Sequence, residues 1–389
     1  MLSKQKKYII GIDAYNIRAG GGVTHILEIL KNVVPENFNF EKVIIWAPDY
    51  TLKQIENKSW LIKVESNFLN SSTLKRYLWK IFLSRLEYKK YKIDILLVPG
   101  GTYLGSFRPF ITINQNLLPF ESNEIKRYGL SPNFFKFHIL KLLQCITNRN
   151  SNGIIFLTYY AMNKVLNVCK LSNKNYRIIP HGVSERFDYN PTERSFRNFD
   201  DFSKESPFKI LYISSIEIYK HQWVVIEAIR ILYENGYNVK LTLVGPKGSG
   251  SKKLENILQG IKPELIEYIG LASYETIQNL YLNADIGIFA SSCETFGMIL
   301  TESMSCGLPL AASNMSAIPD VLSDAGLYFN PENALEIAEA IKKMMISSDL
   351  RRDLAKKGYT HVKKFNWINS SNDTFNFIDE ILKNYKKIG

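Results

Sequence analysis

The chain has 389 residues, which is too many for one ordinary hydrophobic core and suits two domains of similar size. With 46% hydrophobic residues and no apolar run of about 18 residues, its composition is that of a globular protein and excludes a transmembrane helix. The formal net charge of +12 predicts attraction to an anionic partner, such as a nucleotide diphosphate or an acidic membrane. No helix-turn-helix or RNA-binding signature accompanies this charge, so we expect no nucleic-acid partner.

The first apolar run, within residues 8–12, is too short for a signal peptide, so we expect a cytoplasmic protein. The four cysteines have no close pair in the sequence and no neighbouring histidine cluster, which indicates neither a zinc site nor a disulfide framework. We therefore expect no bound metal and four structural thiols, at Cys145, Cys169, Cys293 and Cys306.

Apolar runs alternate with helical patterns along the whole chain, which predicts an α/β fold. The predicted strands form two series. The first series covers residues 8–12, 42–46, 93–98, 110–113, 153–157 and 177–179, and the second covers residues 209–213, 239–244, 266–269, 285–290, 308–311 and 326–329.

These two series divide the chain into four segments. Residues 1–187 form the first domain. Residues 188–207 are polar and have neither a helical nor a strand period, so we expect a linker there. Residues 208–368 form the second domain, and residues 369–389 form an amphipathic C-terminal helix.

A glycine triplet, Gly20 to Gly22, follows the first predicted strand and opens a predicted helix. Because glycine has no Cβ atom, its backbone can approach a ligand more closely than that of other residues. We therefore interpret Gly21 and Gly22 as part of a binding loop.

Two predicted helical stretches of the first domain are both basic and aromatic, over residues 74–85 and 133–143. A helix with lysine and arginine beside tryptophan and phenylalanine can lie on an anionic membrane. The same composition also fits a core helix with lysines at its rim, and the narrow polar arc of the first stretch favours that interpretation.

Glu294 and Glu302 lie eight positions apart in the segment that restricts the chemistry of the chain most tightly. An apolar run over residues 284–290 predicts a buried parallel strand, and residues 296–306 favour a helix that Gly307 ends. Glu294 then lies in a strand-to-helix turn and Glu302 on the second helical turn. Both carboxylates can face a crevice at the carboxyl ends of the strands, where open α/β sheets bind ligands.

The run from Ser292 to Pro309 resembles the E-x7-E signature of family 4 retaining glycosyltransferases, with Thr-Phe-Gly between the glutamates and Ser-Cys-Gly-Leu-Pro after them. The resemblance covers nearly the whole chain and implies the GT-B fold, in which two Rossmann-like domains face each other across a cleft. The C-terminal helix would cross back to the first domain. The first domain would bind the acceptor and the second domain the nucleotide-sugar donor.

The resemblance also implies roles for the glutamates and for the turn between them. Glu302 would bind the ribose hydroxyls, because a carboxylate can accept two hydrogen bonds from a vicinal diol. Glu294 would hold the transferred sugar and stabilise positive charge at its anomeric carbon. The backbone N–H groups of Phe296, Gly297 and Met298 would bind sugar hydroxyls.

In the family, the turn after the first strand of the donor domain carries an arginine and, five residues later, a lysine that together neutralise the diphosphate. Lys220 matches the lysine, but Ser215 stands where the arginine is expected. Lys247 is a candidate for the missing cation. Gly21 and Gly22 match the glycine-rich loop that faces the donor phosphates.

Two further positions match family segments that contact the acceptor or the sugar. Gln115 and Asn116 replace a His-Asp pair, and because an amide cannot exchange a proton near neutral pH, we expect Asn116 to act only as a hydrogen-bonding ligand. His181 matches a Pro-Asn/His-Gly-Val turn near the interdomain hinge.

We therefore expect a retaining, metal-independent hexosyltransferase that needs no cofactor and uses a nucleotide-diphosphate sugar as donor. Its acceptor would be a glycan or a lipid-linked sugar in surface polysaccharide biosynthesis, such as that of lipopolysaccharide, in the cytoplasm or at the inner face of the membrane. Two alternatives stay open: a nucleotide-sugar epimerase of the same fold, and a non-catalytic protein that binds a glycan or a partner. A glycosidase also uses two carboxylates, but the phosphate-binding context disfavours it.

Overall fold

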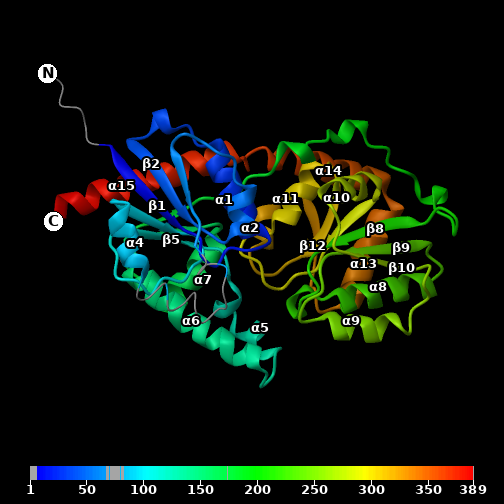
Figure 1. The fold of residues 1–389 in the computed structure, drawn as a ribbon. Helices are drawn as coiled ribbons and strands as arrows, with labels where there is room; N and C mark the ends of the chain where they lie inside the picture. The colour runs from blue at the N-terminus through cyan, green and yellow to red at the C-terminus, as the bar shows by residue number, and fades with distance from the viewer. Residues whose placement is uncertain (1–6, 67–69, 71–78, 80–82, 173, 389) are drawn as a thin grey trace. The chain divides into compact units, whose positions relative to one another are not determined.

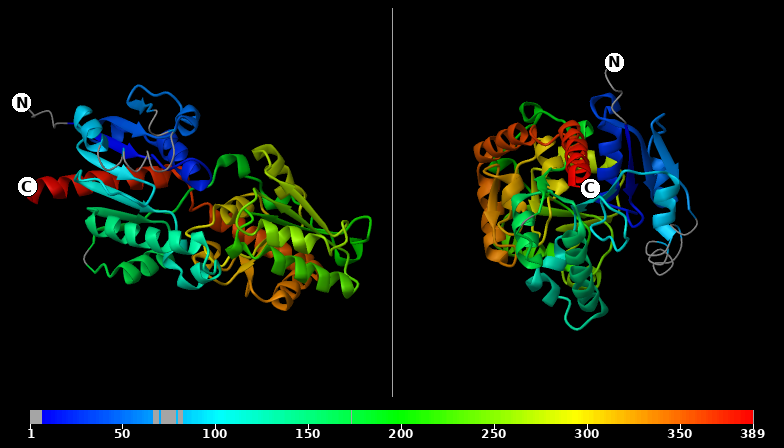
Figure 2. Two further views of the ribbon diagram at one scale, coloured as in Figure 1. Left: turned by 60° about the horizontal axis from the view of Figure 1, so that its bottom comes forward. Right: turned by 90° about the vertical axis from the view of Figure 1, so that its left-hand side faces the viewer.

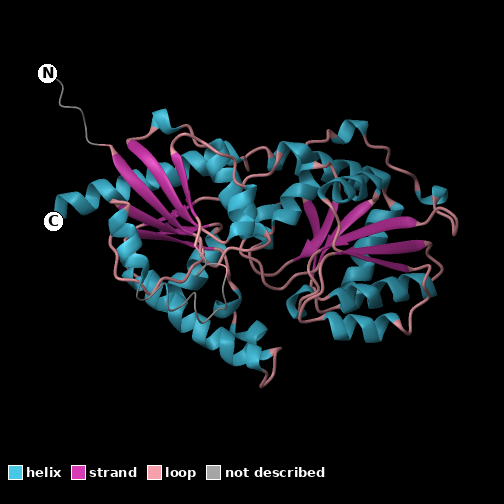
Figure 3. Cartoon of the chain, viewed as in Figure 1, coloured by secondary structure: helices cyan, strands magenta, loops and turns pink. Residues whose placement is uncertain are grey.

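The computed structural model describes residues 7–66, 70, 79, 83–172 and 174–388, apart from the side chains of Tyr274 and Ile388. The chain divides into two compact units. Unit 1 contains residues 1–125, 129–182 and 366–389, and unit 2 contains residues 126–128 and 183–365. Each unit has one parallel β-sheet with helices on both faces (Figures 1 and 3).

The sheet of unit 1 has seven strands in the order β3-β2-β1-β4-β5-β6-β7. The strands are β1 (Tyr8–Asp13), β2 (Phe40–Trp46), β3 (Leu61–Val64), β4 (Ile95–Val98), β5 (Phe110–Asn114), β6 (Gly153–Phe156) and β7 (Tyr176–Ile178). The α-helices around it are α1 (Gly21–Asn32), α2 (Asp49–Gln54), α4 (Ser84–Lys90), α5 (Ser122–Lys126), α6 (Pro132–Asn150), α7 (Tyr159–Cys169) and α15 (Trp367–Ile388), and the 3-10 helices are η1 (Pro35–Asn37) and η3 (Leu118–Phe120).

The sheet of unit 2 has six strands in the order β10-β9-β8-β11-β12-β13. The strands are β8 (Phe208–Ile213), β9 (Val239–Val244), β10 (Ile266–Gly270), β11 (Ile286–Phe289), β12 (Leu310–Ser313) and β13 (Gly326–Phe329). The α-helices are α8 (Gln222–Glu234), α9 (Ser251–Leu258), α10 (Tyr274–Asn283), α11 (Met298–Ser305), α12 (Ile318–Leu322), α13 (Ala334–Ile346) and α14 (Ser348–Val362), and the 3-10 helices are η4 (Glu185–Phe187), η5 (Pro191–Glu193), η6 (Phe199–Asp201) and η7 (Ile218–Lys220).

The predicted α/β fold is confirmed, and each strand of the two predicted series is present with ends shifted by two residues at most. These strands were recognisable because a strand buried on both faces reads as a continuous apolar run. Every residue of β4, β5 and β11, for example, is buried. The sequence analysis missed β3, a short edge strand in which only Leu61 is buried, so its apolar signal is weak.

Both sheets are doubly wound, with the strand order reversing between two central neighbours. In unit 1 the reversal lies between β1 and β4, and in unit 2 it lies between β8 and β11. Loops that leave the carboxyl ends of such a strand pair diverge to opposite faces of the sheet and leave a crevice for a ligand. The loops after β8 and β11 are therefore where unit 2 is expected to bind a ligand.

The C-terminal helix α15 belongs to unit 1, as the GT-B fold requires. The hydroxyl of Ser371 donates a hydrogen bond to the carbonyl of Ile29 on α1 (2.8 Å), and the hydroxyl of Tyr8 on β1 bonds to Asp379. Gly182 lies directly against the backbone of Trp367, so a Cβ atom there would collide with it. The start of α15 is thus packed where the chain leaves unit 1.

Residues 188–207, expected to form a linker, lie within unit 2 and contain η5 and η6. Arg194 holds this segment in place, because its guanidinium donates hydrogen bonds to the carbonyls of Tyr281, Ala284 and Cys306 at 2.7 to 3.1 Å. The polar composition that suggested a linker therefore serves packing against the end of α10 and the start of β11.

Three other expectations can be compared with the structure. Cys145 and Cys169 form a disulfide between α6 and the end of α7, so the expectation of four thiols was wrong for these two, while Cys293 and Cys306 are free and buried. The basic aromatic stretch over residues 74–85 lies largely outside the described residues. In the part of the chain that the structure describes, no helix combines the length and the apolar character that crossing a membrane requires.

Candidate active site

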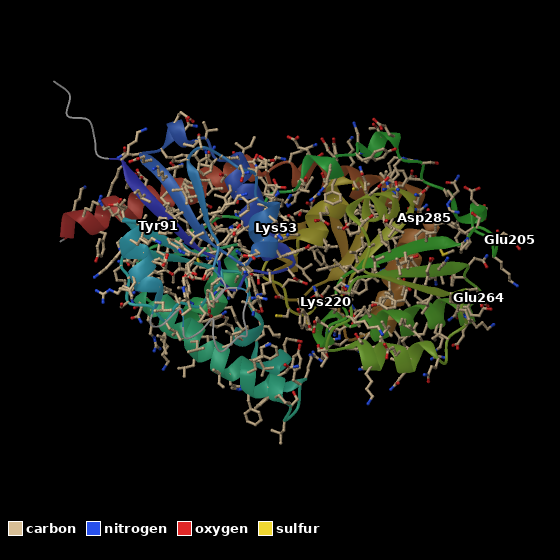
Figure 4. The ribbon with its side chains drawn as sticks, viewed as in Figure 1. Lys53, Tyr91, Glu205, Lys220, Glu264 and Asp285 are labelled. Carbon is tan, nitrogen blue, oxygen red and sulfur yellow. A yellow bond between two sulfur atoms is a disulfide. The ribbon has the colours of Figure 1, made fainter. Side chains whose placement is uncertain are left out.

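Two loops meet beyond the carboxyl ends of the central strands of unit 2. The first loop follows β8 and ends with η7, which carries Lys220. The second follows β11 and carries Glu294 before α11 begins at Met298. Figure 4 labels Lys220 beyond these strand ends, whereas Asp285, at the start of β11, lies toward the opposite end of the sheet.

The Lys220 ammonium and the Glu294 carboxylate form an ion pair. Both side chains are largely buried, with relative exposures of 11% and 14%. The ammonium also lies 5.0 Å from the centre of the Phe289 ring and 5.4 Å from that of Tyr219, within the range of cation–π attraction. Lys220 is thus held in one place by a carboxylate and two aromatic faces.

Glu294 is fixed by the loop that follows β12. Its backbone N–H donates to the hydroxyl oxygen of Ser316 (2.9 Å), and the same hydroxyl donates to the Glu294 carbonyl (2.9 Å). On the other side, the backbone N–H of Ser292 donates to the carbonyl of Tyr219 (2.8 Å). The loop is therefore tied to the strand ends on both sides of β11, which fixes the backbone of Glu294, while the ion pair with Lys220 holds its carboxylate.

His221 joins the same two loops. Its Nε2 lies 2.8 Å from the hydroxyl of Ser292. Burial lowers the pKa of His221 to about 4, so the ring is neutral near neutral pH and serves as a hydrogen-bonding strut.

Glu302 lies on the second turn of α11, as predicted. The hydroxyl of Tyr281 on α10 donates a hydrogen bond to its carboxylate (3.1 Å). Burial raises the pKa of Glu302 to about 7, although the Tyr281 hydroxyl and the nearby Arg186 charge favour the ionised form. A carboxylate of this kind gains from any ligand that brings further hydrogen-bond donors.

The three backbone positions named in the sequence analysis lie at the start of α11. Gly297 precedes the helix with φ of 84°, a left-handed conformation that favours glycine. The ring of Phe296 is buried. Met298 is the first helical residue, so its N–H group and that of Ile299 have no partner within the helix and can face a ligand, whereas the N–H of Leu300 donates to the Gly297 carbonyl (2.9 Å).

The turn after β8 lacks the arginine expected at Ser215. Gln222 fixes the turn instead, because its Nε2 donates to the carbonyl of Ser215 and to the hydroxyl of Ser214, both at 2.9 Å. Gly245 packs so closely on the Ser214 carbonyl that a Cβ atom would collide with it. Lys247, the candidate replacement cation, is exposed and paired with Glu255 at 2.6 Å.

The candidate residues of unit 1 also follow strand ends. Gly21 and Gly22 form the first turn of α1, after β1, and a Cβ atom on Gly22 would lie 3.6 Å from Oε1 of Gln115, which follows β5. Asn116 is exposed, and its Oδ1 accepts the backbone N–H of Leu118 (3.2 Å), which starts η3. The structure therefore brings Gly22 and Gln115 together and gives Asn116 a local structural contact.

His181 is buried and faces another histidine rather than solvent. Its Nδ1 lies 3.0 Å from Nδ1 of His25 on α1, and both rings contact Trp367 of α15. Burial lowers the pKa of both imidazoles, that of His25 to about 4, so the pair is neutral near neutral pH.

Sequence reasoning missed several residues that shape the site: Tyr281, His221, Ser292 and Ser316. Each forms a hydrogen bond to a residue at least 21 positions away, and a local sequence pattern cannot predict such a bond. Among the residues that the structure describes, no group of three or more His, Cys, Asp or Glu side chains could hold a metal ion.

The match to a protein family lies within unit 2. Residues 194–361 match the family described as glycosyl transferases group 1. Over 168 residues the chain is 30% identical to the O-antigen chain mannosyltransferase B of Escherichia coli, an alignment that covers 43% of the chain and 44% of that protein. The chain thus spans less than half of the length of this relative.

Solved structures resemble the whole chain. The glycosyltransferase from Rickettsia africae ESF-5 has a TM-score of 0.71 at 19% identity, over 98% of this chain and 100% of that one. HepE of Anabaena in complex with UDP-glucose has a TM-score of 0.68 at 16% identity, over 95% and 98% of the two chains. Likeness at these identities shows the fold. The chain therefore has the two-domain α/β fold of the GT-B glycosyltransferases, and its residues 194–361 match the group 1 glycosyl transferases.

Proposed function

We propose that this protein is a retaining glycosyltransferase that moves a sugar from a nucleotide-diphosphate sugar to a glycan or a lipid-linked acceptor. The observation that carries the proposal is the Lys220–Glu294 ion pair beyond the carboxyl ends of the unit 2 strands, with Glu302 on the helix that follows. One cation and two carboxylates in this order suit the diphosphate, the sugar and the ribose of a donor. The group 1 match and the UDP-glucose complex of the structural neighbour HepE support the same assignment.

The ion pair defines how a donor would enter. The diphosphate would replace Glu294 as the ion-pair partner of Lys220. The free N–H groups at the start of α11 would also attract the diphosphate through their partial positive charge. Negative charge grows on the diphosphate as the glycosidic bond breaks, so a cation aimed at it lowers the barrier more than it stabilises the bound donor. Glu294 would then be free to accept hydrogen bonds from the sugar and to stabilise positive charge at the anomeric carbon.

Glu302 would accept hydrogen bonds from the two ribose hydroxyls, which requires its ionised form. Tyr281 would hold the carboxylate in position through its hydroxyl. Burial raises the pKa of Glu302 because the ionised carboxylate loses hydrogen bonds to water. The two ribose hydroxyls would replace those hydrogen bonds and so stabilise the ionised form.

The transfer step would retain the anomeric configuration. The acceptor hydroxyl would attack the anomeric carbon on the face that the diphosphate leaves, and its proton would pass to the departing diphosphate as the new C–O bond forms. This route needs neither a metal ion nor a cofactor, because Lys220 supplies the charge that the leaving group requires.

The acceptor would be a growing surface polysaccharide or a lipid-linked sugar in the cytoplasm, at the inner face of the membrane. The name of the Escherichia coli relative, an O-antigen chain mannosyltransferase, supports a polysaccharide acceptor and a hexose donor. It makes GDP-mannose the first donor to test, beside the UDP-glucose bound by HepE.

A thermal-shift panel of UDP-, GDP-, ADP- and dTDP-sugars tests the donor site, because a ligand that binds the folded state raises the melting temperature. We expect one nucleotide class to stabilise the wild type and the Glu302→Gln variant to lose that shift. The preferred donor is then incubated with a saccharide acceptor, and NMR of the product reports its anomeric configuration.

The outcomes separate the alternatives. Inversion at the anomeric carbon would contradict the retaining mechanism. Conversion of the donor sugar into its epimer without transfer would favour an epimerase, and donor binding without any turnover would favour a non-catalytic protein. No shift with any nucleotide sugar would contradict a donor site in unit 2.

A further inference from the structure

Helix α6 of unit 1 exposes large apolar side chains, and most of the residues that it buries fully are polar. The residues it buries include Gln144, Thr147 and Asn148. Phe135, Ile139 and Leu142 are 56%, 59% and 60% exposed. A surface helix normally turns its apolar side chains inward, so a second, exposed apolar stripe on α6 points to a partner outside unit 1.

The exposed apolar side chains form one stripe. Phe135, Ile139 and Leu142 follow the i, i+4, i+7 spacing and therefore share a face of the helix. Leu130, just before the helix, is 85% exposed. Figures 1 and 2 show α6 on the outside of unit 1, where its packing is against η3 and α7.

A disulfide and a hydrogen bond anchor the C-terminal part of the helix, just after this stripe. Cys145 on the buried side is bonded to Cys169 at the end of α7. The Thr147 hydroxyl accepts the backbone N–H of Tyr103 at 2.8 Å. The stripe is thus presented by a fixed element and not by a loop.

The sequence segment that contains the stripe carries charge of one sign. Residues 129–184 contain no Asp or Glu, and seven Lys or Arg residues lie among them: Lys136, Lys141, Arg149, Lys164, Lys170, Lys174 and Arg177. On α6 itself, neither Lys136 nor Lys141 is paired with a carboxylate among the described residues. The helix therefore offers two cations beside its apolar stripe and carries no acidic residue of its own.

We propose that the stripe formed by Phe135, Ile139 and Leu142, with Lys136 and Lys141 beside it, is a docking surface for an anionic lipid membrane. The apolar side chains would enter the boundary between headgroups and acyl chains, and the lysines would contact lipid phosphates. Charge of one sign beside exposed large apolar side chains favours a lipid surface over a second copy of this chain, whose own α6 carries the same positive charge. The inference extends the proposed membrane-side acceptor, but the docking surface does not depend on the chemistry of unit 2.

The test is co-sedimentation of the full chain with vesicles of phosphatidylcholine alone or mixed with phosphatidylglycerol, without donor or acceptor. We expect binding to the mixed vesicles that weakens as salt is added. The variant Phe135→Ser/Ile139→Ser/Leu142→Ser should bind at least about a hundredfold more weakly. Each of Lys136→Gln and Lys141→Gln should weaken binding about fivefold.

A control variant replaces three exposed apolar residues of unit 2, Leu271→Ser/Leu335→Ser/Ile346→Ser, which are 81%, 66% and 51% exposed. This control should bind like the wild type, and both triple variants should keep the wild-type melting temperature because the replaced side chains are exposed. Equal binding of the wild type and the α6 variant would overturn the proposal. A wild-type dimer in light scattering that the α6 variant converts to a monomer would overturn it in favour of an interface between copies. Either result would leave the donor shift of unit 2 intact, so the two proposals fail separately.

Discussion

The ammonium of Lys220 and the carboxylate of Glu294 pair with each other although 74 residues separate them in the chain. The pair lies where the strand order of unit 2 reverses, with one partner after β8 and the other after β11. Because the two opposite charges compensate each other, this largely buried site has no net charge until a charged ligand binds.

Breaking the pair should cost stability, and restoring neutrality should recover it. Lys220→Gln and Glu294→Gln each leave one largely buried charge without its partner, so we expect each to lower the free energy of unfolding by about 2–3 kcal/mol. The double variant should regain most of this loss. All three variants should lose about 100-fold or more in turnover, because each lacks a group that stabilises the transition state.

Urea unfolding and donor turnover measure the two effects separately. Lys240→Gln is the control, because Lys240 forms an exposed pair with Glu267 in the same sheet and its loss should change stability by about 0.5 kcal/mol or less. A double variant that is no more stable than either single variant would contradict the neutral pair.

Donor affinity should depend on the ionisation of Glu302. Burial raises the pKa of this carboxyl to about 7, and only the ionised form accepts both ribose hydrogen bonds. We expect affinity to rise with pH, to level off above about pH 7, and to fall about tenfold per pH unit below it. Calorimetry with an intact nucleotide sugar, whose diphosphate does not titrate in this range, measures the profile.

Two variants check the assignment of this profile. Glu302→Gln should bind weakly at every pH. Tyr281→Phe should shift the midpoint upward, because the Tyr281 hydroxyl favours the ionised form. Without a donor, the raised pKa means that the Glu302 contribution to the free energy of unfolding is present below about pH 4.5 and is lost as pH rises to about 7. A profile that is flat in the wild type would contradict the role of Glu302.

The buried pair of His25 and His181 should make unit 1 sensitive to acid. Burial lowers the pKa of both imidazoles, so the unfolded chain binds more protons than the folded one as pH falls below about 6.5. The free energy of unfolding should therefore fall by about 2 kcal/mol per histidine between about pH 7 and pH 5.

His181→Asn keeps a hydrogen-bonding side chain beside His25 but removes one titrating group. Urea unfolding of this variant at the two pH values should show about half of the decrease that the pair causes. His138→Asn is the control, because it removes an exposed histidine of α6 and leaves the buried pair intact. A variant that keeps the full wild-type decrease would show that the pair is not the source.

The disulfide between Cys145 and Cys169 should be visible in thiol titration. Protein unfolded without a reductant should show two reactive thiols, from Cys293 and Cys306, and reduced protein should show four. Because the bond closes a loop between residues 24 positions apart, the variant Cys145→Ser/Cys169→Ser should lose about 3 kcal/mol of unfolding free energy. Four thiols without a reductant would contradict the bond.

The sequence by itself determined most of the strands and the positions of the two glutamates relative to them. Buried parallel strands such as β9 and β11 are short apolar runs, and the turn between β11 and α11 places Glu294 and Glu302 by local rules of helix start and stop. These features depend on neighbours in the chain, which the sequence lists directly. The edge strand β3 escaped because only one of its residues is buried.

Only the tertiary structure decided which distant groups meet. The bond between Lys220 and Glu294, the contact of His25 with His181 across 156 residues, and the disulfide of α6 each join segments that local propensity treats as independent. The outward direction of the α6 stripe was equally hidden, because a helical period shows that a helix has an apolar face but not which face packs on the protein. Burial, and with it the raised pKa of Glu302, arises only when the whole unit closes around a residue.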